Sequence, residues 1–97
     1  MAVFHPGHES LHGFTVVAFL KDGSALAGRY DHAVGGGIEF LDASRSSPPG
    51  HDGASVFLAR LRSEGPRPEV ARLRVPAESV DRIVPLGDWL RSGDSAG

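Results

Sequence analysis

The apolar residues of this chain fall in short runs that glycine, proline and polar residues separate. Runs of this length with turn residues between them are typical of short β-strands rather than of long helices. The predicted strands cover residues 14–21, 24–33, 38–43, 56–62, 70–75 and 80–86. The pattern therefore predicts an all-β fold, a small and strongly bent barrel of five or six antiparallel strands.

The first two runs meet at Asp22-Gly23. An Asp-Gly pair tolerates the positive φ angles of a two-residue hairpin turn, so it predicts two antiparallel strands in fixed register. Gly28 lies inside the second run. A glycine within a strand is typical of a bulge or sharp bend, which lets a short sheet curl into a barrel.

The remaining segments carry turn and loop residues. Residues 1–13 contain a proline and a closing glycine that favour one short N-terminal helical turn. Residues 44–54 are rich in serine, proline and glycine, which predicts a mobile loop within the barrel domain 14–86. Residues 87–97 hold Trp89 and then become polar, so they are predicted to form a flexible tail.

The first predicted strand is apolar on both faces. Val16, Ala18 and Leu20 share one face, and Val17 and Phe19 share the other. Either the strand is bent inside a barrel, or a neighbouring subunit covers one face. Because a small sheet also leaves open edges, we expect a homo-oligomer, a ring or a dimer, joined through edge strands.

The composition of the chain excludes several classes of function. The chain has 97 residues, enough for one domain, and a net charge of −2, which disfavours a generally basic nucleic-acid-binding domain. It has no cysteine, which excludes a disulfide framework and a thiolate metal site. No apolar run approaches the ~20 residues that cross a bilayer, and the start is unlike a signal peptide. We expect a cytoplasmic protein without a membrane partner.

The first hairpin carries a recognisable order of residues, namely Val16, Leu20, Lys21, Asp22, Gly23, Leu26 and Gly28, followed by Ile38, Asp42 and Ala43. This order resembles the first signature of the Sm-like (Lsm) family, a group of small SH3-like barrels. The resemblance covers roughly residues 6–45 well and 70–86 loosely. It implies an N-terminal helix, a strongly bent five-stranded barrel and closure of the subunits into rings.

Two departures from that family concern RNA. Its RNA-binding members carry an Asp and an Asn in the loop between strands two and three, where residues 33–37 here read Ala-Val-Gly-Gly-Gly. The family's second signature, Ile-Arg-Gly before the last strand, is replaced at 75–79 by Val-Pro-Ala-Glu-Ser. The resemblance therefore implies the fold without the RNA-binding signature residues.

Arginines form the candidate binding site. Arg60 and Arg62 alternate on one face of the predicted strand 56–62, and Arg72 and Arg74 do so on 70–75. Antiparallel pairing of these strands would gather them on one hairpin face with Arg67 near its tip. Such a cluster would accept a carboxylate or phosphate partner. The alternative is an ordinary solvated face that protects a sheet edge.

The sequence gives little support for a metal site or a catalytic site. His5, His8 and His12 have the spacing of one helix face, but no cysteine or well-spaced carboxylate completes a ligand set, so no metal site is predicted. Asp31 and His32 are neighbours on a strand and should point to opposite faces. The chain has no nucleophile-elbow motif and no phosphate-binding loop motif. We predict no catalytic residue and no cofactor.

These observations predict a non-enzymatic binding or assembly module whose partner is another protein, including copies of itself. The alternative is a nucleic-acid-binding Sm-like protein that uses the arginine-rich hairpin face. The two differ in their response to salt, because binding of RNA or DNA through several arginines weakens steeply as salt rises.

Overall fold

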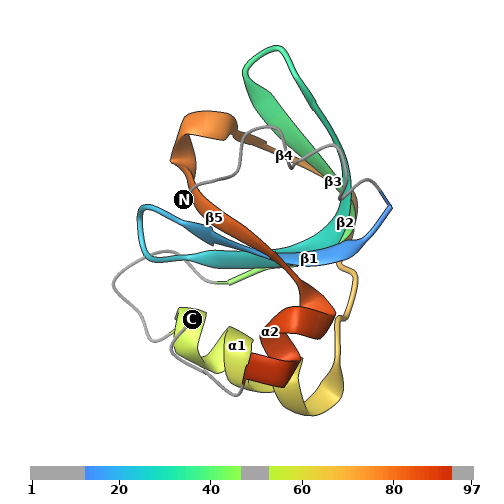
Figure 1. Cartoon of the computed structure of the whole chain (residues 1–97), viewed down its shortest axis with the longest axis vertical. Coiled ribbons are helices and arrows are strands. Elements are labelled where there is room, and N and C mark those ends of the chain that lie inside the picture. Colours follow the sequence, from blue (N-terminus) through green and yellow to red (C-terminus); the bar gives the residue numbers. More distant parts are fainter. Residues whose placement is uncertain (1–12, 47–52, 93–97) are drawn as a thin grey trace.

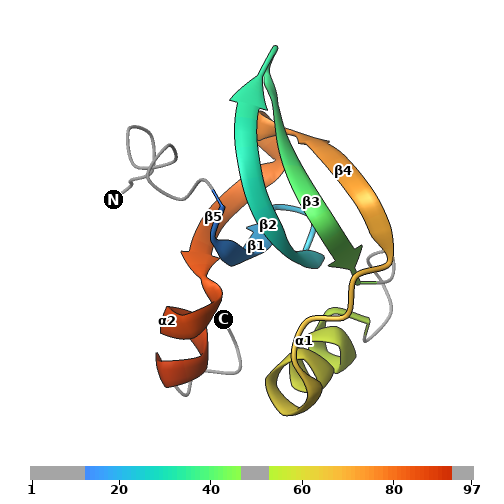
Figure 2. The same cartoon turned by 90° about the vertical axis from the view of Figure 1, so that its right-hand side faces the viewer.

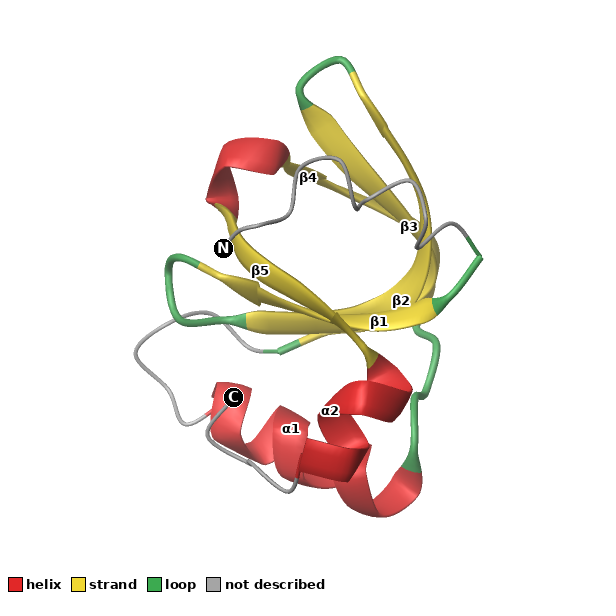
Figure 3. Cartoon of the chain, viewed as in Figure 1, coloured by secondary structure: helices red, strands yellow, loops and turns green. Residues whose placement is uncertain are grey.

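Five antiparallel strands form a single strongly bent sheet in the order β4-β3-β2-β1-β5 (Figures 1 and 3). The computed structural model describes residues 13–46 and 53–92. Its elements are β1 Thr15–Leu20, β2 Ala25–Val34, β3 Gly37–Arg45, α1 Gly53–Glu64, β4 Val70–Pro76, the 3₁₀ turn η2 Ala77–Ser79, β5 Val80–Pro85 and α2 Leu86–Ser92. The prediction of a bent all-β sheet is confirmed for these five strands.

The ends of the sheet remain apart. β4 and β5 are its two edges, and they do not pair with each other in the part of the chain that the structure describes. The helices in this part lie in mid-chain and after the last strand (Figure 1). The helical turn predicted within residues 1–13 lies outside the described residues, apart from residue 13.

The first hairpin forms where Asp22-Gly23 predicts it. The Leu20 amide donates to the Ser24 carbonyl at 2.9 Å, so the loop has three residues rather than the predicted two, with Gly23 at a φ of 92°. The Asp22 carboxylate accepts the Ser24 hydroxyl at 2.5 Å and the Ser24 amide at 2.9 Å. Both hydrogen bonds lower the pKa of Asp22, and the bond from the Ser24 hydroxyl has the larger effect. The charged carboxylate thus stabilises this turn.

Gly28 lies at a bulge, as predicted, and it also marks a close approach of two strands. A Cβ atom at this position would lie 2.8 Å from Ala43 Cβ and 3.2 Å from the Leu41 carbonyl oxygen. The register of β2 against β3 shifts at the same place, between Ala27 and Arg29. The missing side chain therefore lets β3 fold tightly across β2 and bend the sheet.

Both faces of the bent sheet carry a core. The inner cluster holds Val16, Ala18, Leu20, Leu26, Tyr30, Ile38, Phe40, Ala43, Val75 and Val80. The outer cluster holds Val17, Ala25, Ala27, Leu58, Leu61 and Trp89, and so joins the sheet to the two helices. The second apolar face of β1 is therefore covered by the chain's own helices, and it needs no neighbouring subunit.

The predicted strand 56–62 is wrong, because these residues lie in α1. Apolar and polar residues alternate along this run, as in a strand, but the run also fits a helix in which Phe57, Leu58 and Leu61 share one side. Alanine, leucine and arginine are also strong helix formers. Gly65 ends the helix at a φ of 83°, with its amide donating to the Leu61 carbonyl at 2.9 Å.

The predicted mobile loop and flexible tail are also partly wrong. β3 continues to Arg45, and α1 begins at Gly53, so only residues 47–52 of the loop lie outside the description. Residues 86–92 form α2, and Trp89 is only 2% exposed. Burying one large indole against the sheet stabilises this short helix, which its polar composition does not suggest. None of the described helices is long and apolar enough to cross a lipid bilayer.

We predict that Gly28→Ala destabilises the protein by about 1–3 kcal/mol, because its Cβ meets the backbone and side chain of Ala43. Gly87→Ala is the matched control. Its Cβ would lie 3.5 Å from the Arg91 guanidinium, an ordinary contact, and alanine favours helix, so it should stabilise by up to about 1 kcal/mol. Urea unfolding measures both; equal stability of the two variants would contradict this role of Gly28.

Candidate functional site

The five candidate arginines do not share one hairpin face. Arg60 and Arg62 lie on α1, Arg72 and Arg74 lie on β4, and Arg67 lies on the linker between them. The predicted pairing of 56–62 with 70–75 is therefore wrong; β4 pairs with β3 instead. The five side chains occupy three separate environments, and only Arg60 and Arg67 line the same pocket.

Arg62 holds the two helices together. Its guanidinium lies 4.3 Å from the centre of the Trp89 ring. It also donates to the Leu90 carbonyl at 3.0 Å and to the Trp89 carbonyl at 3.3 Å. Cation–π contact and hydrogen bonds to helix carbonyls both stabilise this packing, so we assign Arg62 a structural role.

Arg72 and Arg74 project from β4, and both are engaged within the chain. Arg72 forms an ion pair with Glu39 at 2.7 Å. Arg74 donates to the carbonyls of Val34 and Gly35 at 3.0 and 3.3 Å, so it lies along the β2–β3 hairpin. A Cβ atom at Gly37 would lie 2.5 Å from Arg74 Nε, which shows how closely this side chain packs on the turn.

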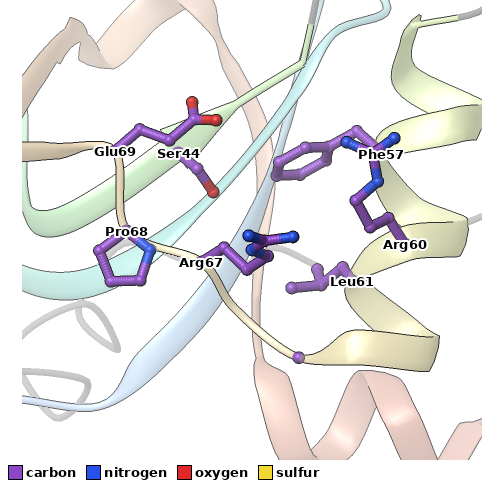
Figure 4. A pocket seen from close by; sticks show the side chains of 8 residues that line it. Ser44, Phe57, Arg60, Leu61, Arg67, Pro68 and Glu69 are labelled. Carbon is purple, nitrogen blue, oxygen red and sulfur yellow. The ribbon is translucent and has the colours of Figure 1, made fainter.

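Arg60 and Arg67 meet at a pocket between α1 and the linker that leads to β4. Its volume is about 320 Å³. Its lining residues are Ser44, Phe57, Arg60, Leu61, Gly65, Arg67, Pro68 and Glu69 (Figure 4). Phe57 and Leu61 provide apolar wall, and Arg67 extends toward them from the linker. The pocket thus combines an apolar surface with two cationic groups and one carboxylate, that of Glu69.

The two cations of this pocket differ in their partners. Arg67 forms an exposed ion pair with Glu64 at 3.2 Å. The Arg60 guanidinium is exposed and has no ion pair or hydrogen bond to another residue within 13–46 or 53–92. An exposed pair such as Arg67–Glu64 contributes little stability. Both guanidinium groups are therefore accessible to an anionic partner.

A bulge overturns the prediction for Asp31 and His32. The register of β2 shifts between Tyr30 and His32, so these neighbours point the same way and His32 Nδ1 lies 2.7 Å from Asp31 Oδ2. Their ligand atoms and one of Glu39 all lie within 4.8 Å of one another. Three donors are one fewer than a closed zinc site needs, and Glu39 is already paired with Arg72. His5, His8 and His12 lie outside the described residues.

Comparison with solved structures identifies the architecture. A heptameric archaeal Sm protein aligns with a TM-score of 0.56 and 16% identity, over 84% of this chain and 97% of that one. The Pyrococcus abyssii Sm protein in complex with a uridine heptamer aligns with a TM-score of 0.55 and 15% identity, over 82% and 93%. The SmAP (LSm) protein of Methanococcus vannielii gives 0.51 and 18%, over 81% and 89%.

The chain has an Sm-like fold. The resemblance drawn from the first hairpin is thereby confirmed at the level of architecture. No protein-family model and no curated protein matches the sequence. At identities below one fifth, likeness of this kind establishes the fold alone.

The two segments whose sequences differ from the Sm-like signatures, residues 33–37 and 75–79, lie side by side in this fold. The Ala77 amide donates to the Gly36 carbonyl at 2.9 Å, so residues 33–37 and 75–79 are neighbours. A second pocket of about 340 Å³ lies here, lined by Gly35, Gly36, Gly37, Arg74, Val75 and Pro76. Its one cation, Arg74, is bonded to hairpin carbonyls. The segments that carry the family's RNA signatures thus meet here without those residues.

Sequence reasoning found the arginines but missed their apolar neighbour Phe57. Its ring forms part of the wall beside Arg60 only because 56–62 is helical. The spacing of Phe57 and Leu61, four residues apart, is the signal that finds this wall. The prediction of a tail at Trp89 missed the area that one indole ring can bury, since Trp89 is part of the outer core cluster.

We predict that Arg62→Ala lowers stability by about 1–2 kcal/mol, because it removes the contact with the Trp89 ring and two hydrogen bonds. In a domain of this size that corresponds to a fall in Tm of roughly 4–16 °C. Arg29→Ala serves as control, because Arg29 makes only an exposed ion pair with Asp42 and should change stability by less than ~0.5 kcal/mol. Calorimetry that finds the two variants equal would remove the structural role of Arg62.

Proposed function

We propose that this protein is a non-enzymatic assembly module whose copies join through the two edges of the sheet. The observation that carries the proposal is the strand order, which leaves β4 and β5 as opposite edges without a second neighbouring strand among the described residues. Both pair antiparallel with their single neighbours. β4 of one copy can therefore extend the sheet through β5 of the next, in a head-to-tail contact that closes into a ring.

The β4 edge has the character of an interface. Val70 is 44% exposed on this strand, although valine is typical of a covered sheet position. Arg72 and Arg74 of the same strand, two of the predicted binding residues, are each held by contacts to β3 or to the β2–β3 hairpin. These contacts fix the edge in an extended form before a partner arrives. The heptameric state of the archaeal Sm protein supports the same arrangement.

We predict that the protein is a homo-oligomer at micromolar concentration and that Val70→Lys weakens association at least roughly tenfold, or ~1.4 kcal/mol per contact. A lysine on an edge strand opposes strand addition. Val34→Lys is the matched control, because Val34 is similarly exposed, at 42%, but lies beside the β2–β3 turn and on neither edge strand. Light scattering with size-exclusion chromatography measures both. A monomer of 10.2 kDa for the unmodified protein would refute the assembly role.

A second candidate function is binding of single-stranded RNA. The supporting observation is the pocket in which an aromatic ring, Phe57, lies beside two accessible guanidinium groups, Arg60 and Arg67. Bases stack on aromatic rings, and arginines neutralise phosphates. The Pyrococcus abyssii Sm protein, which shares the fold, was solved with a uridine heptamer. The net charge of −2 limits such binding to a local patch.

If this second function holds, the affinity for a fluorescein-labelled oligouridylate falls as potassium chloride rises, with a log–log slope of about −0.7 for each phosphate contact. The double variant Arg60→Glu with Arg67→Glu should abolish that binding, because it reverses both cations of the pocket. Lys21→Glu, in the turn between β1 and β2 and outside the pocket lining, should not. Fluorescence anisotropy reports all three. Absence of binding by the unmodified protein at roughly 50 mM salt removes RNA as a partner.

A further inference from the structure

We infer that the pocket between α1 and the linker 65–69 receives helix α2 of the next copy in the assembly. This inference rests on the proposed edge-to-edge assembly and adds to it a second, helical contact. The occupant is a second copy of this chain, and its contacting residue is the exposed Leu90 of α2.

Exposed apolar side chains mark the two sides of the molecule that would meet. Of the five large apolar residues that are exposed in the described part of the chain, Val56 and Val70 lie on α1 and β4. Phe14 precedes β1, the neighbour of β5, and Leu90 lies on α2, which follows β5. Only Val34, at the β2–β3 hairpin, lies elsewhere. Exposed apolar side chains therefore lie near each of the two edge strands.

The strand direction places these surfaces against each other. When β5 of one copy adds antiparallel to β4 of another, its end at Pro85 meets the start of β4 at Val70. The linker 65–69 and α1 precede Val70, and α2 follows Pro85 without an intervening residue. Figure 2 shows α1 on the side of β4 and α2 on the side of β5, and within one copy the two helices meet where Arg62 packs on Trp89. Side-by-side copies therefore bring α2 of one next to α1 of the other.

The chemistry of the two surfaces is complementary. The pocket offers the apolar wall of Phe57 and Leu61 and the Arg60 guanidinium, which has no partner among the described residues. α2 offers Leu90, which is 38% exposed. Docking covers Leu90 against Phe57 and Leu61, with the aliphatic stem of Arg60 beside it and the Arg60 guanidinium at the rim in water.

Disulfide trapping tests this contact, because the chain has no cysteine of its own. Arg60→Cys and Leu90→Cys are made as separate variants, unfolded together and refolded into mixed assemblies, then oxidised mildly. Because each chain carries one cysteine, a covalent dimer between the two variants can only join different copies. We expect this dimer as the main product of the mixture, several-fold above either variant alone. Val34→Cys mixed with Leu90→Cys is the control, and it should give little.

The outcomes separate the inference from the proposed assembly. Light scattering before oxidation reports assembly; if only monomers form, the assembly fails and the docking fails with it. If assemblies form but the 60–90 dimer is no more abundant than the 34–90 control, the docking is wrong and the strand contact stands. A dimer that is specific to 60–90 supports the docking. If added oligouridylate then lowers the yield of that dimer while the assembly persists, RNA and α2 compete for the pocket, which also supports docking of α2 in the absence of RNA.

Discussion

The tight crossing of β2 and β3 at Gly28 is the constraint on which the architecture depends. With Ala43 only 2.8 Å from where a Cβ would be, this position admits no side chain. The sheet turns back on itself there and encloses Tyr30 and Phe40, whose rings meet edge to face at 6.1 Å. A flatter sheet would leave these large residues in water. The bend therefore creates the inner core and, by the same geometry, separates the two edges.

The outer side of the bend poses a different problem, since Val17, Ala25 and Ala27 face away from the inner core. Two short helices from distant parts of the chain cover this surface. Neither covers it alone, because Leu58 and Leu61 come from α1 and Trp89 comes from α2. Arg62 joins the helices over the indole ring. The sheet thus depends on α1 and α2 as a pair, which leaves the far side of α1 open as a pocket.

The strands and the bend were predictable because single residues mark them in the sequence. Asp22-Gly23 sets its turn within a few residues, Gly28 marks the bend although the atoms it admits belong to Leu41 and Ala43 of β3, and the apolar pattern of β1 shows that both of its faces are covered. The helix at 53–64 was missed because Val56 to Arg62 fits period two and a helical face equally well, and contact with the sheet decides between them. The predicted arginine site was wrong for the same reason. Because Arg60 and Arg62 lie on a helix, they cannot share a hairpin face with Arg72 and Arg74. The bulge that turns Asp31 toward His32 could not be predicted, because no glycine or proline marks it in the sequence.

The two layers of the core also differ in their chromophores. The chain has one tryptophan and one tyrosine. Trp89 lies in the helical layer under the Arg62 guanidinium, and Tyr30 lies in the inner core against Phe40. Indole fluorescence therefore reports the helices, whereas tyrosine absorbance reports the strands. This division makes the native chain its own pair of optical probes, so the order in which its two layers separate during unfolding is readable without any label.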